Sequence, residues 1–284
     1  MKKNALMQPL GSDEEIKKFV LKKLQDYSAI PALSEHEDQM LSFLKTDFDR
    51  KDWYELKVNG VTEFCYLQQD LACPDYFFTV HTDRVPSFSR GNRSAFTNTI
   101  VDQGEVLQGQ LDDIIGISVL CYLHSLNYPM NILFTAKEEY CISWKQLHQT
   151  ILAFSDSLVL PMKPISIDID IFPSLSSFKD GQVTLRSFDN CGSMDPILVS
   201  LLRHCASKVT VPYFKDSIGT AIVEPGFLAQ HTDGVFKGAH IGIPLINYHT
   251  DKEQTYWLVV YHIVKLIQRF LLDTITTGEQ TCRH

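Results

Sequence analysis

Residues 76–83 read YFFTVHTD, an apolar run that ends abruptly in His81, Thr82 and Asp83. A short run rich in aromatic and β-branched side chains is typical of a buried strand. Three later segments have the same character: NILFT at 131–135, ISIDIDI at 165–171 and PLINY at 244–248. We therefore expect four buried strands, each close to an ionisable residue.

Segments with helical periodicity alternate with these strands. The predicted helices cover residues 13–28, 36–50, 114–126, roughly 143–153, 196–208 and 256–272. We find no internal repeat and no Gly-, Ser- or Pro-rich linker long enough to divide the chain. The alternation predicts one α/β domain over residues 1–284, a three-layer sandwich whose mostly parallel central sheet is covered by helices.

Composition narrows the functional class. The 284 residues include 17 Phe, 11 Tyr and 3 Trp, which is ample material for a folded core. The net charge of −8 disfavours nucleic acid and anionic membranes as partners. No apolar run approaches the roughly 18 residues of a membrane span, and the N-terminal residues show no targeting pattern, so we expect a cytoplasmic protein. The 7 Cys are scattered without a CxxC pair, which favours reduced core thiols.

Ionisable residues mark the end of every predicted strand. They are His81 and Asp83 after the first, Glu138 and Glu139 after the second, Asp168 and Asp170 in the third, and His249 after the fourth. Asp112 and Asp113 stand at the start of the helix predicted at 114–126. Because the carboxyl ends of parallel strands meet at one edge of a sheet, these side chains should converge. Imidazoles together with carboxylates suit zinc or a similar divalent ion.

The acids and histidines exceed what one tetrahedral ion needs, which favours a pair of ions bridged by a carboxylate. Asp112 is the natural bridge. One ion would then take His81 and Asp168, with Asp170 as a rival for Asp168, and the other would take His249 and Glu139. Acids inside an Ile-rich strand are costly unless they are paired or bound to a cation.

Two acids are left for other roles. Glu138 would lie beside the ions without being needed as a ligand, where a general base for water belongs. Asp83 would accept the second N–H of the His81 ring and orient it. Each pattern taken alone is also compatible with a structural role without function, since an HxD sequence also occurs in surface turns and a Glu pair often begins a solvated helix.

The ordered motifs resemble those of the co-catalytic metallopeptidases, which include peptidase T, the tetrahedral aminopeptidases and carboxypeptidase G. The resemblance rests on IPALSEHE at 30–37, FFTVHTDRVP at 77–86, GQLDDIIGI at 109–117, FTAKEE at 134–139, SIDIDI at 166–171 and HTDGVFKGAHIGIPLINYHTDKE at 231–253. It spans roughly residues 14–272. The resemblance implies a zinc-exopeptidase-like fold and a cis peptide between Asp112 and Asp113.

By position, the resemblance implies two divalent ions, zinc with cobalt or manganese as alternatives. The implied ligands are His81, Asp112, Glu139, Asp168 and His249, with Glu138 as base and Asp83 behind His81. The intervals between these motifs are too short for the inserted lid or dimerisation domain of the relatives, so we expect the catalytic domain alone. The segment HTDKE at 249–253 replaces a more familiar His-Ser-Pro-x-Glu.

The leading hypothesis is a binuclear metal-dependent hydrolase that cleaves an amide bond, an aminopeptidase acting on short peptides. An N-acyl amino acid deacylase or carboxypeptidase is the alternative, with Arg84 or Lys252 available to bind a substrate carboxylate. A non-catalytic binding module on a peptidase fold is the third reading, because a fold does not dictate function. The oligomeric state stays open.

Overall fold

The computed structural model describes most of the chain. The described residues are 7–30, 32, 37–48, 53–58, 61–68, 76–84, 100–136, 138, 165–173, 179–189, 192–214, 223, 225–226, 230 and 237–281.

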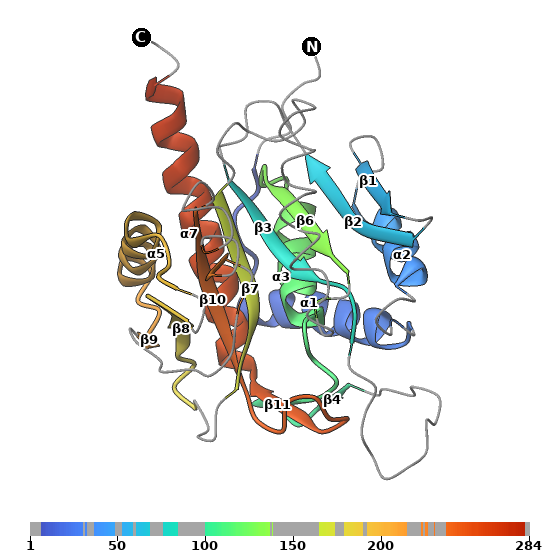
Figure 1. The fold of residues 1–284 in the computed structure, drawn as a ribbon. Helices are drawn as coiled ribbons and strands as arrows, with labels where there is room; N and C mark the ends of the chain where they lie inside the picture. Colours follow the sequence, from blue (N-terminus) through green and yellow to red (C-terminus); the bar gives the residue numbers. More distant parts are fainter. Residues whose placement is uncertain are drawn as a thin grey trace.

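Within these residues, an eight-stranded sheet forms the centre of the protein (Figure 1). Its strand order is β1 (Trp53–Val58), β2 (Val61–Gln68), β6 (Asn131–Thr135), β3 (Tyr76–His81), β7 (Ile165–Pro173), β10 (Lys237–Leu245), β8 (Val183–Leu185) and β9 (Tyr213–Phe214). The four central strands β6, β3, β7 and β10 are mutually parallel. Their carboxyl ends therefore meet along one edge of the sheet, as the sequence predicted.

A second, three-stranded sheet lies near this edge, at the bottom of Figure 1. It orders β11 (Glu253–Tyr256), β5 (Val106–Gly109) and β4 (Val101–Asp102), all antiparallel. A bridge between Ile246 and Gln254 joins the end of β10 to β11. The small sheet thus lies next to the loops that leave the central strands.

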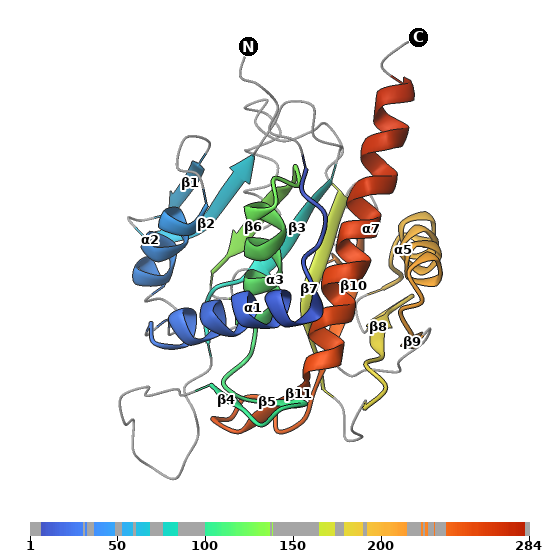
Figure 2. The same cartoon turned by 180° about the vertical axis from the view of Figure 1, so that it is seen from behind.

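Helices pack on one face of the central sheet, as Figure 2 shows for α1, α3 and α7. The helices are α1 (Asp13–Ser28), α2 (Asp38–Asp47), α3 (Ile114–Ser125), α5 (Pro196–Lys208) and α7 (Trp257–Thr281). Local sequence fixes several of the ends. Ser12 and Glu15 form a reciprocal capping box at the start of α1, and the Asp195 side chain caps α5 just before Pro196.

The two faces of the central sheet differ in polarity. On β3, Phe78 and Val80 belong to the hydrophobic core shared with the helices. Thr79 and His81 alternate with them along the strand and are equally buried. Since side chains alternate between the faces of a strand, the polar residues share the face opposite the helices that the structure describes. The ionisable groups of the sheet therefore belong to one side.

Most of the predicted elements are confirmed. The helices expected at 13–28 and 196–208 match α1 and α5 in full, and the strand expected at 131–135 matches β6. The strand expected at 244–248 is wrong, because β10 runs from Lys237 to Leu245. Two glycines and a histidine make KGAHIGI look less like a strand than the apolar residues that follow it. The helix expected at about 143–153 lies outside the described residues.

Among the residues that the structure describes, no helix combines the length and hydrophobicity needed to cross a bilayer. The cytoplasmic location stays a prediction from composition. Of the cysteines, Cys121 and Cys205 are free and buried, and burial raises the pKa of the Cys121 thiol to about 11. Both therefore behave as core side chains.

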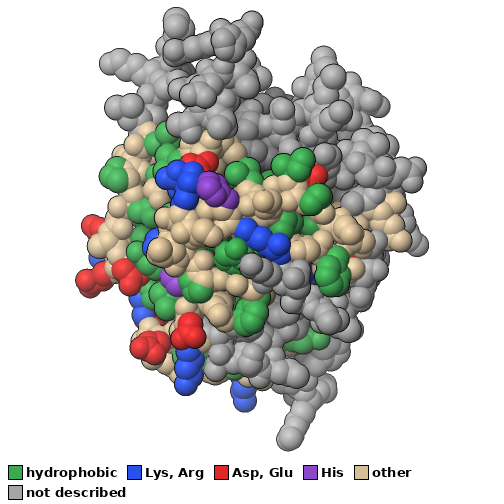
Figure 3. Space-filling view, turned by 90° about the vertical axis from the view of Figure 1, so that its left-hand side faces the viewer, with side chains coloured by type: hydrophobic (Ala, Val, Ile, Leu, Met, Phe, Trp, Pro, Cys, Tyr) green, Lys and Arg blue, Asp and Glu red, His purple; other side chains and the backbone are tan. Residues whose placement is uncertain are grey.

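Exposed hydrophobic side chains occur at the end of the sheet that carries α5 and β9. Ile197 on α5, Phe214 on β9 and Phe188 after β8 are all exposed. Figure 3 looks onto this side, where hydrophobic and charged side chains are interspersed over the described surface. The exposed hydrophobic groups are thus spread among polar surface.

Replacing Phe134 with alanine should test the packing of the helical face. Phe134 is fully buried and packs on the rings of Trp53 at 5.5 Å and Phe48 at 5.4 Å between centroids. We expect the free energy of unfolding in urea to fall by about 3–5 kcal/mol. Ile197→Ala on the exposed face of α5 should change it by less than about 0.5 kcal/mol. Equal effects of the two substitutions would contradict this packing.

Candidate metal centre

Three buried or half-buried ligand groups converge at the carboxyl edge of the central sheet. His81 ends β3, Asp170 lies on β7, and Asp112 precedes α3. The His81 Nε2 atom lies 2.9 Å from Asp112 Oδ1 and 3.5 Å from Asp170 Oδ1. One potential ligand atom of each residue lies within 4.8 Å of the others. The parallel strand order therefore brings together residues that are far apart in the chain.

The orientation of His81 indicates what this cluster binds. Its Nδ1 lies 3.0 Å from the backbone oxygen of Asp83, and a carbonyl oxygen can only accept a hydrogen bond. Nδ1 therefore carries the hydrogen, and a neutral His81 ring presents the lone pair of Nε2 to two carboxylates. That arrangement is repulsive unless a proton or a cation lies between the groups.

His249 approaches the same aspartate from another loop. Its Nε2 lies 3.6 Å from Asp112 Oδ2, and its side chain is 39% exposed. The backbone of His249 is left-handed, with φ of 60°, which costs a non-glycine residue about 1–2 kcal/mol. Asp112 thus offers one carboxylate oxygen to His81 and the other toward His249, as expected for a bridging ligand.

The backbone around Asp112 is held by the start of α3. The peptide between Asp112 and Asp113 is cis, as the family resemblance implied. The Asp113 side chain caps α3 by accepting the Gly116 N–H at 3.1 Å. A Cβ atom on Gly116 would lie 2.7 Å from that carboxylate and 3.0 Å from Val80, so glycine permits this close approach. The helix start therefore lies directly against β3.

The Asp83 side chain is hydrogen-bonded to the backbone of Glu138. Asp83 Oδ1 accepts the Glu138 N–H at 3.0 Å, while its distance to His81 Nδ1 is 3.6 Å. The carbonyl of Asp83, closer than its carboxylate, therefore orients the His81 ring. The same contact holds the Glu138 backbone against Asp83, three residues after the end of β6. Glu139 lies outside the described residues.

Strand register distinguishes the two acids of β7. In the backbone pairing, Asp168 lies between Thr79 of β3 and His240 of β10. Its partner Thr79 precedes His81 by two residues. Asp170 lies two residues nearer the strand end and reaches His81. The Asp168 side chain is outside the described set. The structure thus brings the predicted rival, Asp170, to the cluster.

Electrostatics in the cluster follow from burial and from the opposite charges. Burial alone would lower the pKa of His81, but Asp112, Asp170 and Asp83 outweigh it and raise that pKa well above its usual value. Burial would raise the pKa of Asp112, and the two imidazoles lower it instead. Below the cluster, burial and the nearby Arg186 lower the pKa of His240 to about 3, so this imidazole is neutral. The site therefore favours positive charge at its centre.

Glu253 is the residue that sequence reasoning missed. It is buried on β11 and accepts the backbone N–H groups of Leu111 at 2.5 Å, Asp112 at 3.1 Å and His249 at 2.7 Å. Burial, followed by the neighbouring Asp112 carboxylate, raises its pKa to about 8. The glutamate of HTDKE was visible in the sequence, but two of its three partners, Asp112 and Leu111, are 141 and 142 residues away.

The two basic residues proposed for binding a substrate carboxylate differ in their exposure to solvent. Arg84 is buried and donates to the carbonyls of Tyr27, Ser28 and Ile30 at the end of α1. Its guanidinium therefore holds α1 against the strand that bears His81. Lys252 is exposed, and it lies next to Glu253 in the His249 loop. Of this pair, only Lys252 has a side chain open to solvent.

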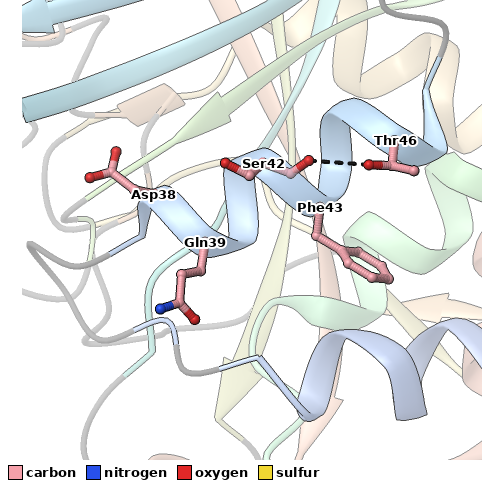
Figure 4. A pocket seen from close by; sticks show the side chains of 5 residues that line it. All are labelled: Asp38, Gln39, Ser42, Phe43 and Thr46. Atoms are coloured by element: carbon pink, nitrogen blue, oxygen red, sulfur yellow. Dashed lines mark hydrogen bonds between the residues drawn. The ribbon is translucent and has the colours of Figure 1, made fainter.

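A depression elsewhere on the surface lacks such chemistry. It is lined by five side chains of α2: Asp38, Gln39, Ser42, Phe43 and Thr46 (Figure 4). The Thr46 hydroxyl donates to the Ser42 carbonyl at 3.3 Å, a hydrogen bond within the helix. Because all five residues come from one helix, the depression is an open surface feature, and the strand-end cluster is the better candidate site.

The donor set of the cluster fits a divalent metal ion. His81, Asp112, Asp170 and His249 offer two imidazole nitrogens and two carboxylates from four separate segments. Nitrogen and carboxylate ligands with a hydrogen-bonded second ring nitrogen are the usual environment of zinc. A bound cation would remove the repulsion between the His81 lone pair and its acidic neighbours.

Comparison with known proteins supports the fold. The chain matches the TET1 peptidase of Pyrococcus horikoshii with a TM-score of 0.65 and 12% identity, over 88% of this chain and 98% of that one. It matches an aminopeptidase from the archaeon Desulfurococcus kamchatkensis with a TM-score of 0.67 and 12% identity, over 92% and 95%. The fold is that of these peptidases. At such identities the likeness shows fold alone.

A tripeptidase from Staphylococcus aureus matches as well, with a TM-score of 0.63 and 10% identity over 92% of this chain and 99% of that one. The Pyrococcus peptidase can assemble into a tetrahedron or a large octahedral shell. No family model and no curated protein matches the sequence. The predicted α/β fold is thus confirmed by its likeness to these solved structures, where sequence comparison finds no match.

Zinc should stabilise the protein through these ligands. At a free zinc concentration about 100 times the dissociation constant, binding should add about 2.7 kcal/mol, which raises the Tm by about 5–10 °C for a chain of this size. Chelation should reverse the shift, as measured by calorimetry. The double variant with His81→Ala and Asp170→Asn should show a much smaller zinc-dependent shift. A shift of the same size in that variant would place the zinc elsewhere.

Proposed function

We propose that the protein is a metal-dependent aminopeptidase that uses two divalent ions to cleave short peptides. One observation carries this proposal: the His81 ring donates through Nδ1 to the Asp83 carbonyl, which leaves its Nε2 facing the carboxylates of Asp112 and Asp170. A buried arrangement of this kind is expected where a cation completes it. The fold shared with aminopeptidases and a tripeptidase supports the same class of reaction.

We assign the ligands by position. His81 and Asp170 would hold one ion, His249 and Glu139 the other, and Asp112 would bridge them. This assignment replaces Asp168 by Asp170, because the distance to His81 favours the residue nearer the strand end. Bound cations of this kind polarise a carbonyl and make water more acidic at neutral pH.

Glu138 would act as the general base. Its backbone is fixed by the hydrogen bond to Asp83, which follows the strand bearing His81. From this place the Glu138 carboxylate would take a proton from the attacking water and pass it to the leaving amine. Asp83 would fix the position of Glu138 relative to His81, because its carboxylate accepts the Glu138 N–H and its carbonyl accepts from the His81 ring.

The substrate would present a free amine. Arg84, one of the two cations proposed for a substrate carboxylate, already donates to three carbonyls at and just after the end of α1. The carboxylates around Asp112 favour a positively charged group nearby. Together these features favour an aminopeptidase over a deacylase or carboxypeptidase.

Glu138→Gln should separate catalysis from metal binding. The amide cannot accept a proton, so we expect hydrolysis of leucine p-nitroanilide to fall by about 10²–10⁴-fold. Metal content by elemental analysis should stay at the wild-type value, because Glu138 is not assigned as a ligand. Near-normal turnover in the variant would show that the base is another group.

The choice between the acids of β7 needs a direct comparison. Asp170→Asn should weaken zinc binding by more than the roughly 10–100-fold that follows from loss of a ligand's hydrogen-bond partner. Asp168→Asn should weaken it less. Competition with a chelating dye measures both affinities. Greater loss in the Asp168 variant would restore the original assignment.

Substrate class is tested by pairing amino acid anilides with N-acyl amino acids. We expect release from the anilide that chelation abolishes. Turnover of the N-acyl substrate alone would indicate a deacylase, with Lys252 as the exposed cation available to a carboxylate. Zinc binding without turnover of either would favour the binding module.

A further inference from the structure

Two loops that carry proposed ligands meet at one buried carboxylate. The Glu253 Oε2 atom accepts the N–H groups of Leu111 and Asp112, and Oε1 accepts the N–H of His249. The first loop leads from β5 to α3, and the second leads from β10 to β11. A single side chain therefore joins the backbones on which Asp112 and His249 are carried.

These contacts require a hydrogen-bond acceptor at both terminal positions of the side chain. All three partners are donors, and the contacts use both oxygens of Glu253. Glutamine has the same shape, but one of its two terminal atoms is an amide nitrogen that donates instead of accepting. Either orientation of the amide would place N–H against N–H in one of the two loops.

The small sheet fixes where Glu253 stands. β11 pairs with β5 so that Glu253 lies opposite Gly109, two residues before Leu111. The bridge between Ile246 and Gln254 holds the other side of the same strand against the end of β10. Glu253 is thus placed between the loops by backbone pairing on both sides.

The His249 turn depends on an anchor of this kind. Asn247 and His249 both have left-handed backbones, with φ of 57° and 60°. Within the turn, the Thr250 hydroxyl donates to the Asn247 carbonyl at 2.6 Å and accepts the Lys252 N–H at 3.1 Å. The N–H of His249 itself points to Glu253. The imidazole direction is therefore set by a backbone that Glu253 holds.

We infer that Glu253 is a positioning residue, which joins the Asp112 and His249 loops so that both side chains reach the same cation pair. This inference rests on the proposed function, because it takes Asp112 and His249 as metal ligands. Glu253 itself contacts their backbones, so it acts on the site through them.

The test compares Glu253→Gln with Asp251→Asn. Asp251 is an exposed acid in the same turn, so its amide variant matches the loss of one negative charge. We expect zinc affinity, measured by competition with a chelating dye, to fall by about 10–100-fold in the Glu253 variant and to stay within about twofold in the control. Circular dichroism and Tm check that both variants fold.

Hydrogen exchange of the metal-free proteins tests the mechanism separately from zinc. Exchange should accelerate in at least one of the segments 109–113 and 246–252 in Glu253→Gln, and elsewhere it should match the control. Unchanged exchange in both segments, or uniform acceleration over the whole chain, would overturn the positioning role. If wild-type protein binds no zinc, the proposed function fails, while the exchange result still decides whether Glu253 joins the loops.

A variant that keeps the charge covers the case in which Glu253→Gln does not fold. Glu253→Asp retains the carboxylate on a side chain shorter by one methylene, so it should fail to hold both loops at once. We expect a loss of zinc affinity of at least about tenfold. Wild-type affinity in this variant, with wild-type exchange, would overturn the inference.

Discussion

Concentrated negative charge at the end of the sheet is the constraint on which the rest of the structure depends. Asp112 and Asp170 have little exposure to water and lie beside the His81 imidazole, and the buried Glu253 accepts the backbone N–H of Asp112. Unpaired buried charges of one sign are strongly unfavourable. The cluster is stable only with positive charge among these groups, from a protonated histidine or from a bound cation. The same requirement that stabilises the fold therefore defines the site.

Backbone N–H groups and a neighbouring cation also stabilise the buried acids. Glu253 is satisfied by three N–H groups, and Asp83 by the N–H of Glu138. Arg84 donates to the Ser28 carbonyl at the end of α1, and the charge of Glu253 favours its protonated form. Each contact that neutralises an acid also ties a loop to a strand end. The same hydrogen bonds therefore stabilise the buried acids and position the proposed ligands.

The sequence predicted local elements where periodicity and capping agreed. The helix at 196–208 has an Asp cap, a proline at its first position and a clear apolar face, and its ends are as predicted. β10 was misplaced because its burial comes from parallel pairing with β7 on one side and antiparallel pairing with β8 on the other. Glycine and histidine are accepted in a strand enclosed in this way, a tertiary effect that no local pattern reveals.

The site was predictable in its types of residue and less so in its details. His81, Asp112 and His249 were found because each stands at a strand or helix end, where topology alone brings them together. Asp168 and Asp170 share one face of β7, so alternation cannot separate them; only register against β3 decides which one reaches His81. Glu253 depends on register in the same way, through the pairing of β11 with β5. How far along a strand a residue lies relative to the neighbouring strand is set by pairing between distant segments. The positions of Asp170 and Glu253 depend on this register, so local sequence could not predict them.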